Sequence, residues 1–197
     1  MVAYESSSTK DSRAHKEQKA ARVFSPRFLM PHQPTTSPVA TRPHMPKDYG
    51  ILQATAGSGL MSWSHASERL AASHNYWVHT TRPDGRPHVK PVWGLWFAER
   101  FYFSTSPRSV NGRNIVAHSS LAVHLESGDD VVILEGKAEV VTDPNLLSQL
   151  DEAYFAKYSY HLIGDRASPV YALRHEVAFT WMERDFAGSA TRYDFQI

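Results

Sequence analysis

The sequence predicts a mainly β (α+β) fold, an antiparallel β-barrel with a few covering helices. Short runs rich in aromatic and β-branched side chains, several with alternating polarity, recur along the chain and indicate half-buried strands. Turn residues separate these runs, as in Pro83-Asp84-Gly85 and Gly128-Asp129-Asp130. Because only two or three stretches show helical spacing, the many short strands are expected to close on one another.

The bulk composition allows one domain with a sizeable core plus a tail, since 42% of the 197 residues are hydrophobic. Lys plus Arg number 21 against 20 for Asp plus Glu, which gives no overall field for nucleic acid or an anionic membrane. The absence of Cys excludes disulfides and thiolate catalysis and agrees with a cytoplasmic location. No apolar run approaches the roughly 20 residues of a membrane-spanning helix.

The first 43 residues differ in composition from the rest. Residues 1–22 are Ser-rich and carry charges of both signs. Prolines, which break helices and strand ladders, follow at Pro26, Pro31, Pro34, Pro38 and Pro43. We therefore predict a disordered or extended tail over residues 1–43 and a barrel domain over residues 44–197.

The N-terminal half of the barrel domain is predicted to contain one helix and three strands. Ser64 can cap the helix, and the residues after it place small and apolar side chains on one side. Pro91 lacks a ladder donor, so a bulge or a sheet edge is expected there. The helix is expected over residues 64–73, and the strands over residues 76–81, 88–97 and 101–104.

The C-terminal half is predicted to contain two helices and three strand segments. Asp143 followed by Pro144 is a strong helix start, because Asp caps the helix and Pro suits its first position. The second of these helices then carries apolar residues at helical spacing. The helices are expected over residues 109–118 and from residue 143, and the strands over residues 121–126, 131–141 and 170–182, the last as one long or two short strands.

The loop over residues 104–114 is the strongest candidate for a binding site. It leads into a predicted helix, whose free N–H groups and dipole favour anions. Gly112 hints that another group approaches the backbone closely there. The alternative is an ordinary strand-to-helix joint with solvated arginines. The side chains that could hold a phosphate or cap the helix beside it are Ser104, Thr105, Ser106, Arg108, Ser109, Asn111, Arg113 and Asn114.

A second candidate lies on the strand predicted over residues 88–97. His88, Lys90 and Val92 share one face of this strand, with Pro91 between them. A flat aromatic ring could lie on this row, with Lys90 near an electron-rich carbonyl edge. The alternative is a solvent-facing Lys and a His satisfied by its neighbours.

Other kinds of catalytic site are not indicated. No cluster among the 11 His residues matches a zinc spacing, and His118 and His124 are interpreted as surface or core histidines. The sequence contains no Gly-x-Ser-x-Gly or Walker motif, and no carboxylate pair suggests hydrolysis. We therefore predict no metal site, and the catalytic residues stay unknown.

Several motifs occur in an order that resembles a known family. They are the runs from Thr81 to Trp93 and from Phe101 to Ser106, then Arg113-Asn114-Ile115, Glu135-Gly136-Lys137-Ala138 and Thr191-Arg192-Tyr193-Asp194-Phe195. Together they resemble the pyridoxamine 5'-phosphate oxidase-like FMN-binding split β-barrel family, most closely its flavin/deazaflavin oxidoreductase branch. The likeness covers residues 42–195. It implies a homodimeric split β-barrel with cofactor sites at the subunit interface.

The resemblance also assigns roles to the two candidate sites. His88, Lys90, Pro91 and Val92 would line the isoalloxazine ring, and the loop over residues 104–114 would hold the phosphate arm. Asn111 stands where members often carry Lys, and Lys90 stands where a small or uncharged residue is usual. The arginine- and histidine-bearing substrate motif of pyridoxamine phosphate oxidases is not visible, so that activity is not expected.

The function expected from these features is an oxidoreductase. FMN or 8-hydroxy-5-deazaflavin (coenzyme F-420) would pass a hydride to a small conjugated substrate, with a proton from water or Tyr102. One alternative is a non-catalytic carrier of flavin, deazaflavin or haem with the same fold. A second alternative is a structural dimer that binds no ligand. Neither nucleic acid nor a membrane is an expected partner.

Overall fold

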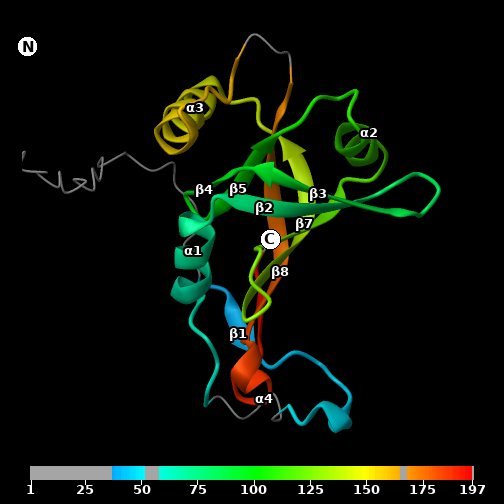
Figure 1. Cartoon of the computed structure of the whole chain (residues 1–197), viewed down its shortest axis with the longest axis vertical. Coiled ribbons are helices and arrows are strands. Elements are labelled where there is room, and N and C mark those ends of the chain that lie inside the picture. The colour runs from blue at the N-terminus through cyan, green and yellow to red at the C-terminus, as the bar shows by residue number, and fades with distance from the viewer. Residues whose placement is uncertain (1–36, 52–57, 165–167, 197) are drawn as a thin grey trace, which may run out of the picture. The chain divides into compact units, whose positions relative to one another are not determined.

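A computed structural model describes residues 37–51, 58–164 and 168–196 of the chain. Within these residues, nine strands form one antiparallel sheet in the order β1-β9-β8-β7-β6-β2-β3, with β4 and β5 joined to it through β8 (Figure 1). The strands are β1 Val39–Thr41, β2 Asn75–Thr81, β3 Pro87–Trp93, β4 Leu95–Phe97, β5 Arg100–Ser104, β6 Ser120–His124, β7 Asp130–Val140, β8 Val170–Met182 and β9 Thr191–Asp194.

Four α-helices in the same part of the chain accompany the sheet. They are α1 Trp63–Ala72, α2 Val110–Ala117, α3 Pro144–Tyr158 and α4 Phe186–Ser189, with short 3-10 turns at Lys47–Tyr49 and Glu183–Asp185. Asp143 caps α3 by accepting the N–H of Asn145, as predicted, with Pro144 at the first helical position. The predicted cap of α1 was wrong by two residues, because Ser62 rather than Ser64 accepts the N–H of His65.

The strand predicted over residues 88–97 is divided into β3 and β4 at Gly94. A Cβ at this position would lie 2.4 Å from the Phe101 ring, so only glycine fits against the neighbouring hairpin. The Tyr158 hydroxyl also accepts the Gly94 N–H at 3.1 Å. Phe101 comes from the facing hairpin strand and Tyr158 from α3, so the alternation pattern within one strand did not reveal the break.

The sheet extends toward the N-terminus into the range predicted to be disordered or extended. β1 pairs with β9 through Val39–Asp194, Ala40–Tyr193 and Thr41–Arg192. Arg42 is buried and donates to the carbonyl of Ala190 at 2.9 Å. Residues 1–36 of the predicted tail over residues 1–43 lie outside the described residues.

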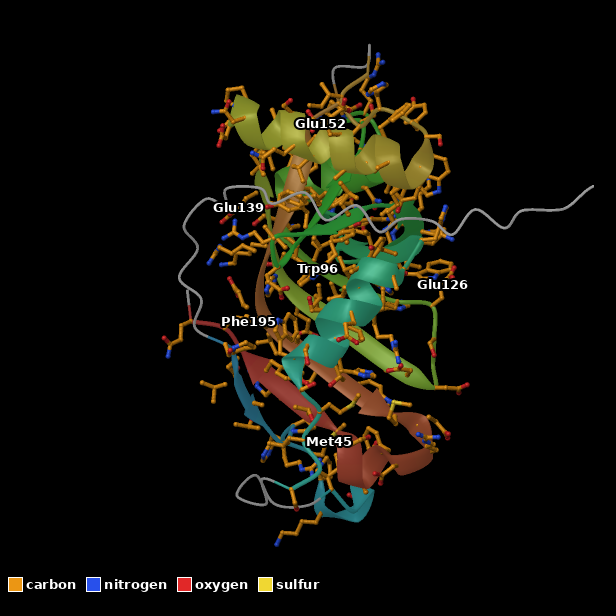
Figure 2. All side chains as sticks on the ribbon, turned by 90° about the vertical axis from the view of Figure 1, so that its left-hand side faces the viewer. Met45, Trp96, Glu126, Glu139, Glu152 and Phe195 are labelled. Atoms are coloured by element: carbon orange, nitrogen blue, oxygen red, sulfur yellow. The ribbon has the colours of Figure 1, made fainter. Side chains whose placement is uncertain are left out.

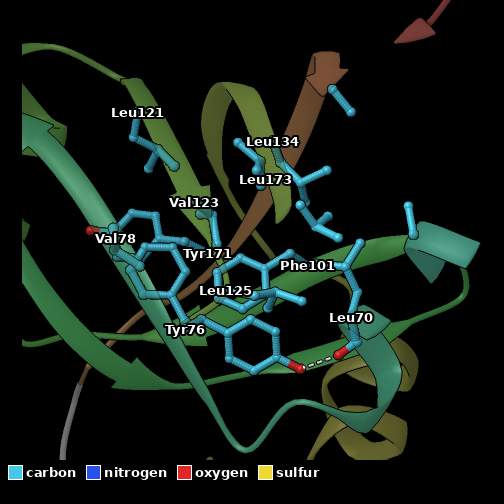
Figure 3. Close-up of a cluster of buried hydrophobic side chains, with 14 of the residues drawn as sticks. Leu70, Tyr76, Val78, Phe101, Leu121, Val123, Leu125, Leu134, Tyr171 and Leu173 are labelled. Carbon is cyan, nitrogen blue, oxygen red and sulfur yellow. Dashed lines mark hydrogen bonds between the residues drawn. The ribbon is translucent and has the colours of Figure 1, made fainter. Parts of the chain in front are cut away.

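The main hydrophobic core lies between the sheet and helices α1 and α2. Tyr76, Phe101 and Phe103 are fully buried in it and pack ring against ring, with centroids 4.7 Å and 5.6 Å apart (Figure 3). A second cluster between α3 and the opposite face of the β5 region contains Leu95, Tyr102, Leu150, Tyr154, Leu162, Val170 and Ala172. Strand β5 therefore contributes side chains to both cores, because its alternate residues face opposite sides of the sheet.

Residues 170–182 form the single long strand β8, which pairs with β7 over its whole length. The register shifts between Glu135 and Gly136, where a Cβ on Gly136 would lie 2.1 Å from the carbonyl oxygen of Arg174. The glycine of the Glu135-Gly136-Lys137-Ala138 motif thus permits the close approach of β8 at this bulge.

Candidate functional site

The loop between β5 and α2 is held by hydrogen bonds between its own residues. The Ser109 side chain caps α2 by accepting the Gly112 N–H at 2.9 Å, and its hydroxyl also hydrogen-bonds that of Thr105 at 2.9 Å. The backbone crosses Gly112 so closely that a Cβ there would lie 2.2 Å from the Ser106 carbonyl oxygen. The close approach hinted at by Gly112 is therefore made by the loop itself, which holds the helix N-terminus rigidly.

Two guanidinium groups flank this helix N-terminus. Arg108 and Arg113 are both exposed, and Arg113 Nη1 donates to the Arg108 carbonyl at 2.6 Å. In the described residues, neither guanidinium forms an ion pair with a carboxylate. Their charge adds to the positive end of the helix dipole, which makes the loop suited to an anion.

Three of the predicted loop residues direct their polar groups into the protein. Asn111 and Asn114 are buried, at 3% and 2% exposure, and both hydrogen-bond the hydroxyl of Thr80 on β2, at 3.2 Å and 2.9 Å. The Ser104 hydroxyl donates to the Pro169 carbonyl at 3.1 Å. These side chains join the loop to its surroundings, so the exposed part of the candidate cradle consists of the residues around Ser106, Arg108 and Arg113.

The row on β3 faces the same side of the sheet as Thr80. Antiparallel pairing places Tyr76 opposite Val92, Val78 opposite Lys90, and Thr80 opposite His88. Paired residues share a face, so the row lies on the core side of β2. Val92 packs against the main core, whereas Lys90 is exposed on the edge strand.

Thr80 links the two candidate sites. Its hydroxyl holds α2 through Asn111 and Asn114, and its register partner on the next strand is His88. Burial lowers the pKa of His88, and the positive charges of Arg82 and Lys90 lower it further. The loop is therefore anchored on the same side of the sheet as the row, where the positive charges of Arg82 and Lys90 act on His88.

Pro91 does not share the face of the row. It lies opposite Trp77 in the β2–β3 ladder, and its missing N–H is tolerated because β3 is the last strand of the sheet order. Tyr102, named as a possible proton source, is buried at 3% exposure in the second cluster under α3. It lies on the face of β5 opposite Phe101 and Phe103, away from the row.

Sequence reasoning missed a polar cluster around Lys157 on α3. Its ammonium donates to the Tyr76 hydroxyl at 3.0 Å and to the Gly94 carbonyl at 3.2 Å, and it lies 5.2 Å from the centre of the Tyr158 ring. Burial lowers the pKa of Lys157 to about 8. The helical spacing of its apolar residues indicated only that α3 covers apolar surface. Nothing in the local sequence shows that Lys157 lies beside Gly94, where β3 ends and β4 begins.

An aromatic cluster lies where α1 crosses the sheet. Trp63 on α1 contacts Trp96, His175 and Phe195, with ring centroids 6.0 Å, 6.0 Å and 4.9 Å away, and Trp96 donates to Ser67 at 2.9 Å. Figure 2 labels Trp96 and Phe195 of this cluster. A cleft of about 540 Å³ opens beside Trp63 and Glu99. A second cleft, of about 420 Å³, lies over β2, β6, β7 and β8 and reaches Thr80 and Pro87.

The sheet, its two hydrophobic cores and the arginine-flanked loop between β5 and α2 define a split β-barrel protein. The chain belongs to the pyridoxamine 5'-phosphate oxidase family, whose family description matches residues 63–186, more than half of its length. No curated protein matches the chain significantly.

Solved structures share this fold at low sequence identity. A conserved hypothetical protein from Mycobacterium tuberculosis superposes with a TM-score of 0.57 and 20% identity, over 65% of this chain and 89% of that one. A haem-binding protein from Mycobacterium smegmatis superposes with a TM-score of 0.52 and 19% identity, over 61% and 54%. An F420 reductase shows a TM-score of 0.46 and 24% identity, over 56% and 94%. No described helix is long and apolar enough to cross a membrane.

Proposed function

We propose that the chain is a flavin- or deazaflavin-dependent oxidoreductase that binds FMN or coenzyme F-420. The observation that carries this proposal is the pair of exposed guanidiniums of Arg108 and Arg113 at the N-terminus of α2, which form no ion pair with a carboxylate of the described residues. A cofactor phosphate there would accept charge-assisted hydrogen bonds from both arginines and from Ser106. Family membership supports the same interpretation.

The cofactor ring would lie against the row on β3. His88 and Val92 are half-buried and would contact the ring, while the exposed Lys90 would stabilise negative charge at the pyrimidine end of the ring. When bound, the reduced cofactor would supply a hydride to a small conjugated substrate. The protein binds and orients the two molecules, and water supplies the proton, since Tyr102 is enclosed in the second cluster.

A non-catalytic carrier of flavin, deazaflavin or haem is the second candidate. Two features favour it. Asn111, which stands where a cationic residue is expected, uses its side-chain oxygen to accept from Thr80 inside the protein. A haem-binding protein from Mycobacterium smegmatis also shares the fold. Turnover with reduced coenzyme F-420 or reduced FMN and a panel of quinones and enones separates the enzyme from the carrier.

The proposal is tested by titrating the purified chain with FMN, riboflavin and coenzyme F-420. Replacing Arg108 or Arg113 by alanine is expected to weaken binding of the phosphate-bearing cofactor about tenfold each, since a hydrogen bond to a charged group contributes about 1.5–3 kcal/mol. Riboflavin lacks the phosphate, so its weaker binding should be unaffected by either change. Isothermal calorimetry measures all three affinities.

Arg86→Ala is the matched control, because Arg86 is an exposed arginine already paired with Asp84 at 2.7 Å. Its affinity for the cofactors should equal that of the wild type. If neither cofactor binds, or if the arginine variants bind FMN as tightly as the wild type does, the proposed phosphate cradle is wrong.

We also propose that the working form is a homodimer, as the family resemblance implies. Val89 and Trp93 on the edge strand β3 expose 46% and 44% of their surface, more than large apolar residues usually leave open together. A second copy that packs on this face of β3 would cover them. Light scattering on the purified chain should give about twice the 22.2 kDa of one chain, and the monomer mass would contradict this.

A further inference from the structure

Two histidines lie together on the face of the sheet opposite the main core. His79 on β2 and His124 on β6 are diagonal neighbours, because His79 pairs with Ala122 and Trp77 pairs with His124. Their ring centroids are 4.8 Å apart. Neither residue belongs to the proposed cofactor row, which lies on the other face of β2.

Each ring has a nitrogen available for a ligand. His124 Nδ1 lies 2.6 Å from the carbonyl oxygen of Leu125, to which it can only donate, so its Nε2 carries the lone pair in the neutral ring. A backbone carbonyl that fixes the tautomer in this way is the usual outer partner of a metal-bound histidine. His79 Nε2 is enclosed and has no hydrogen-bond partner in the described residues.

The surroundings favour neutral imidazoles and hold them in place. Burial lowers the pKa of His79, and the neighbouring His124 lowers it further. Trp77 stacks on His124 at an interplanar angle of 7°, which limits rotation of that ring. Ala122, the small residue opposite His79, lines with it the cleft of about 420 Å³. An unpaired buried nitrogen is costly, and a cation that accepts its lone pair would remove this cost.

We propose that His79 and His124 form a binding site for a borderline divalent transition metal, with Zn²⁺ as the representative ion. Imidazole nitrogen is a preferred ligand of zinc, nickel and copper, and two rings at this separation can share one ion. In the described part of the chain, no group of three or more His, Cys, Asp or Glu side chains could hold a metal. Water would therefore complete the coordination, so the ion would be exchangeable.

The test is calorimetric titration of the chelator-treated full chain with Zn²⁺ alone, in its native assembly. The wild type should bind one ion per chain. His79→Gln and His124→Gln should each weaken binding roughly tenfold or more, and the double variant should weaken it no further, because one lost ligand already breaks the chelate. His118→Gln, a change at an exposed histidine, is the control and should bind like the wild type.

Thermal melts without metal check that the variants fold. Nitrogen couplings from two imidazoles in the electron paramagnetic resonance spectrum of the Cu²⁺-loaded chain would identify the ligands directly. The proposal is overturned if Zn²⁺ does not bind, if the pair variants bind as tightly as the wild type, or if their losses add independently. Cofactor affinity is measured on the same samples, so failure of the metal site and failure of the proposed function are distinguishable.

Discussion

Replacing Tyr76 by alanine is expected to lower the free energy of unfolding by about 3–5 kcal/mol, as for other large aromatic residues removed from cores. Tyr76 is fully buried and packs on Phe101 in the main core. Its loss would leave a cavity under α1, where the Tyr76 hydroxyl donates to the Leu70 carbonyl at 2.6 Å. Since domains are stable by only about 5–15 kcal/mol, the variant should be largely unfolded in mild urea.

Tyr76→Phe separates the ring from the hydroxyl. The ring would stay, but the Leu70 carbonyl and the Lys157 ammonium would each lose a hydrogen-bond partner. We expect a loss of about 1–3 kcal/mol, since buried polar groups without partners are destabilising. Urea denaturation followed by tryptophan fluorescence measures both variants.

Tyr49→Phe is a suitable control, because Tyr49 is 56% exposed and its change should leave the unfolding midpoint in place. A double-mutant cycle of Tyr76→Phe with Lys157→Met should show losses that do not add, because the two groups share one hydrogen bond. Wild-type stability in Tyr76→Phe would show that the network around Lys157 contributes nothing.

Local signals in the sequence predicted local features of the fold. The cap at Asp143 and the start of α2 at Ser109 depend on residues two or three positions apart, so the sequence shows them directly. The division of the strand at Gly94 depends on Tyr158 and Phe101, which tertiary packing brings to it. Propensity and alternation contain no information about such contacts.

In the candidate site, too, the sequence predicted the local features but not those that depend on tertiary packing. The polar, arginine-flanked loop was visible because its residues are consecutive, and the structure leaves Arg108 and Arg113 exposed as an anion site requires. The inward direction of Asn111 and Asn114 was not visible, because it depends on Thr80 of β2. The His79–His124 pair was missed because periodicity does not show that β6 lies beside β2.

Acid is expected to destabilise the protein through His175, at a higher pH than that at which Asp130 and Asp151 lose their charge. Burial lowers the pKa of His175 from its ordinary value of 6.5 to about 4. In the native state its Nδ1 is enclosed among Trp63, Trp96 and Phe195 and has no hydrogen-bond partner within residues 37–51, 58–164 and 168–196. Between pH 6.5 and 4 the unfolded chain therefore binds a proton that the native chain rejects, so stability falls as the pH falls.

The expected loss over this range is about 3 kcal/mol, at 1.36 kcal/mol for each pH unit of the shift. His175→Phe keeps an aromatic ring in the cluster but cannot bind the proton, so its unfolding free energy should change much less between pH 6.5 and 4. His79 and His88, whose pKa values are also lowered, contribute losses in the same direction that stay in the variant. Urea denaturation at several pH values measures the two curves.

His44→Gln is the control, because His44 is exposed and the change should leave the pH dependence of the wild type intact. The carboxylates of Asp130 and Asp151 act at lower pH. Burial opposes their ionisation, but the hydrogen bonds that they accept keep both pKa values below 3.8. Their stabilising contribution is thus lost only as the pH falls below that value, which separates it from the His175 effect. Parallel curves for wild type and His175→Phe would show that the ring is hydrated rather than enclosed.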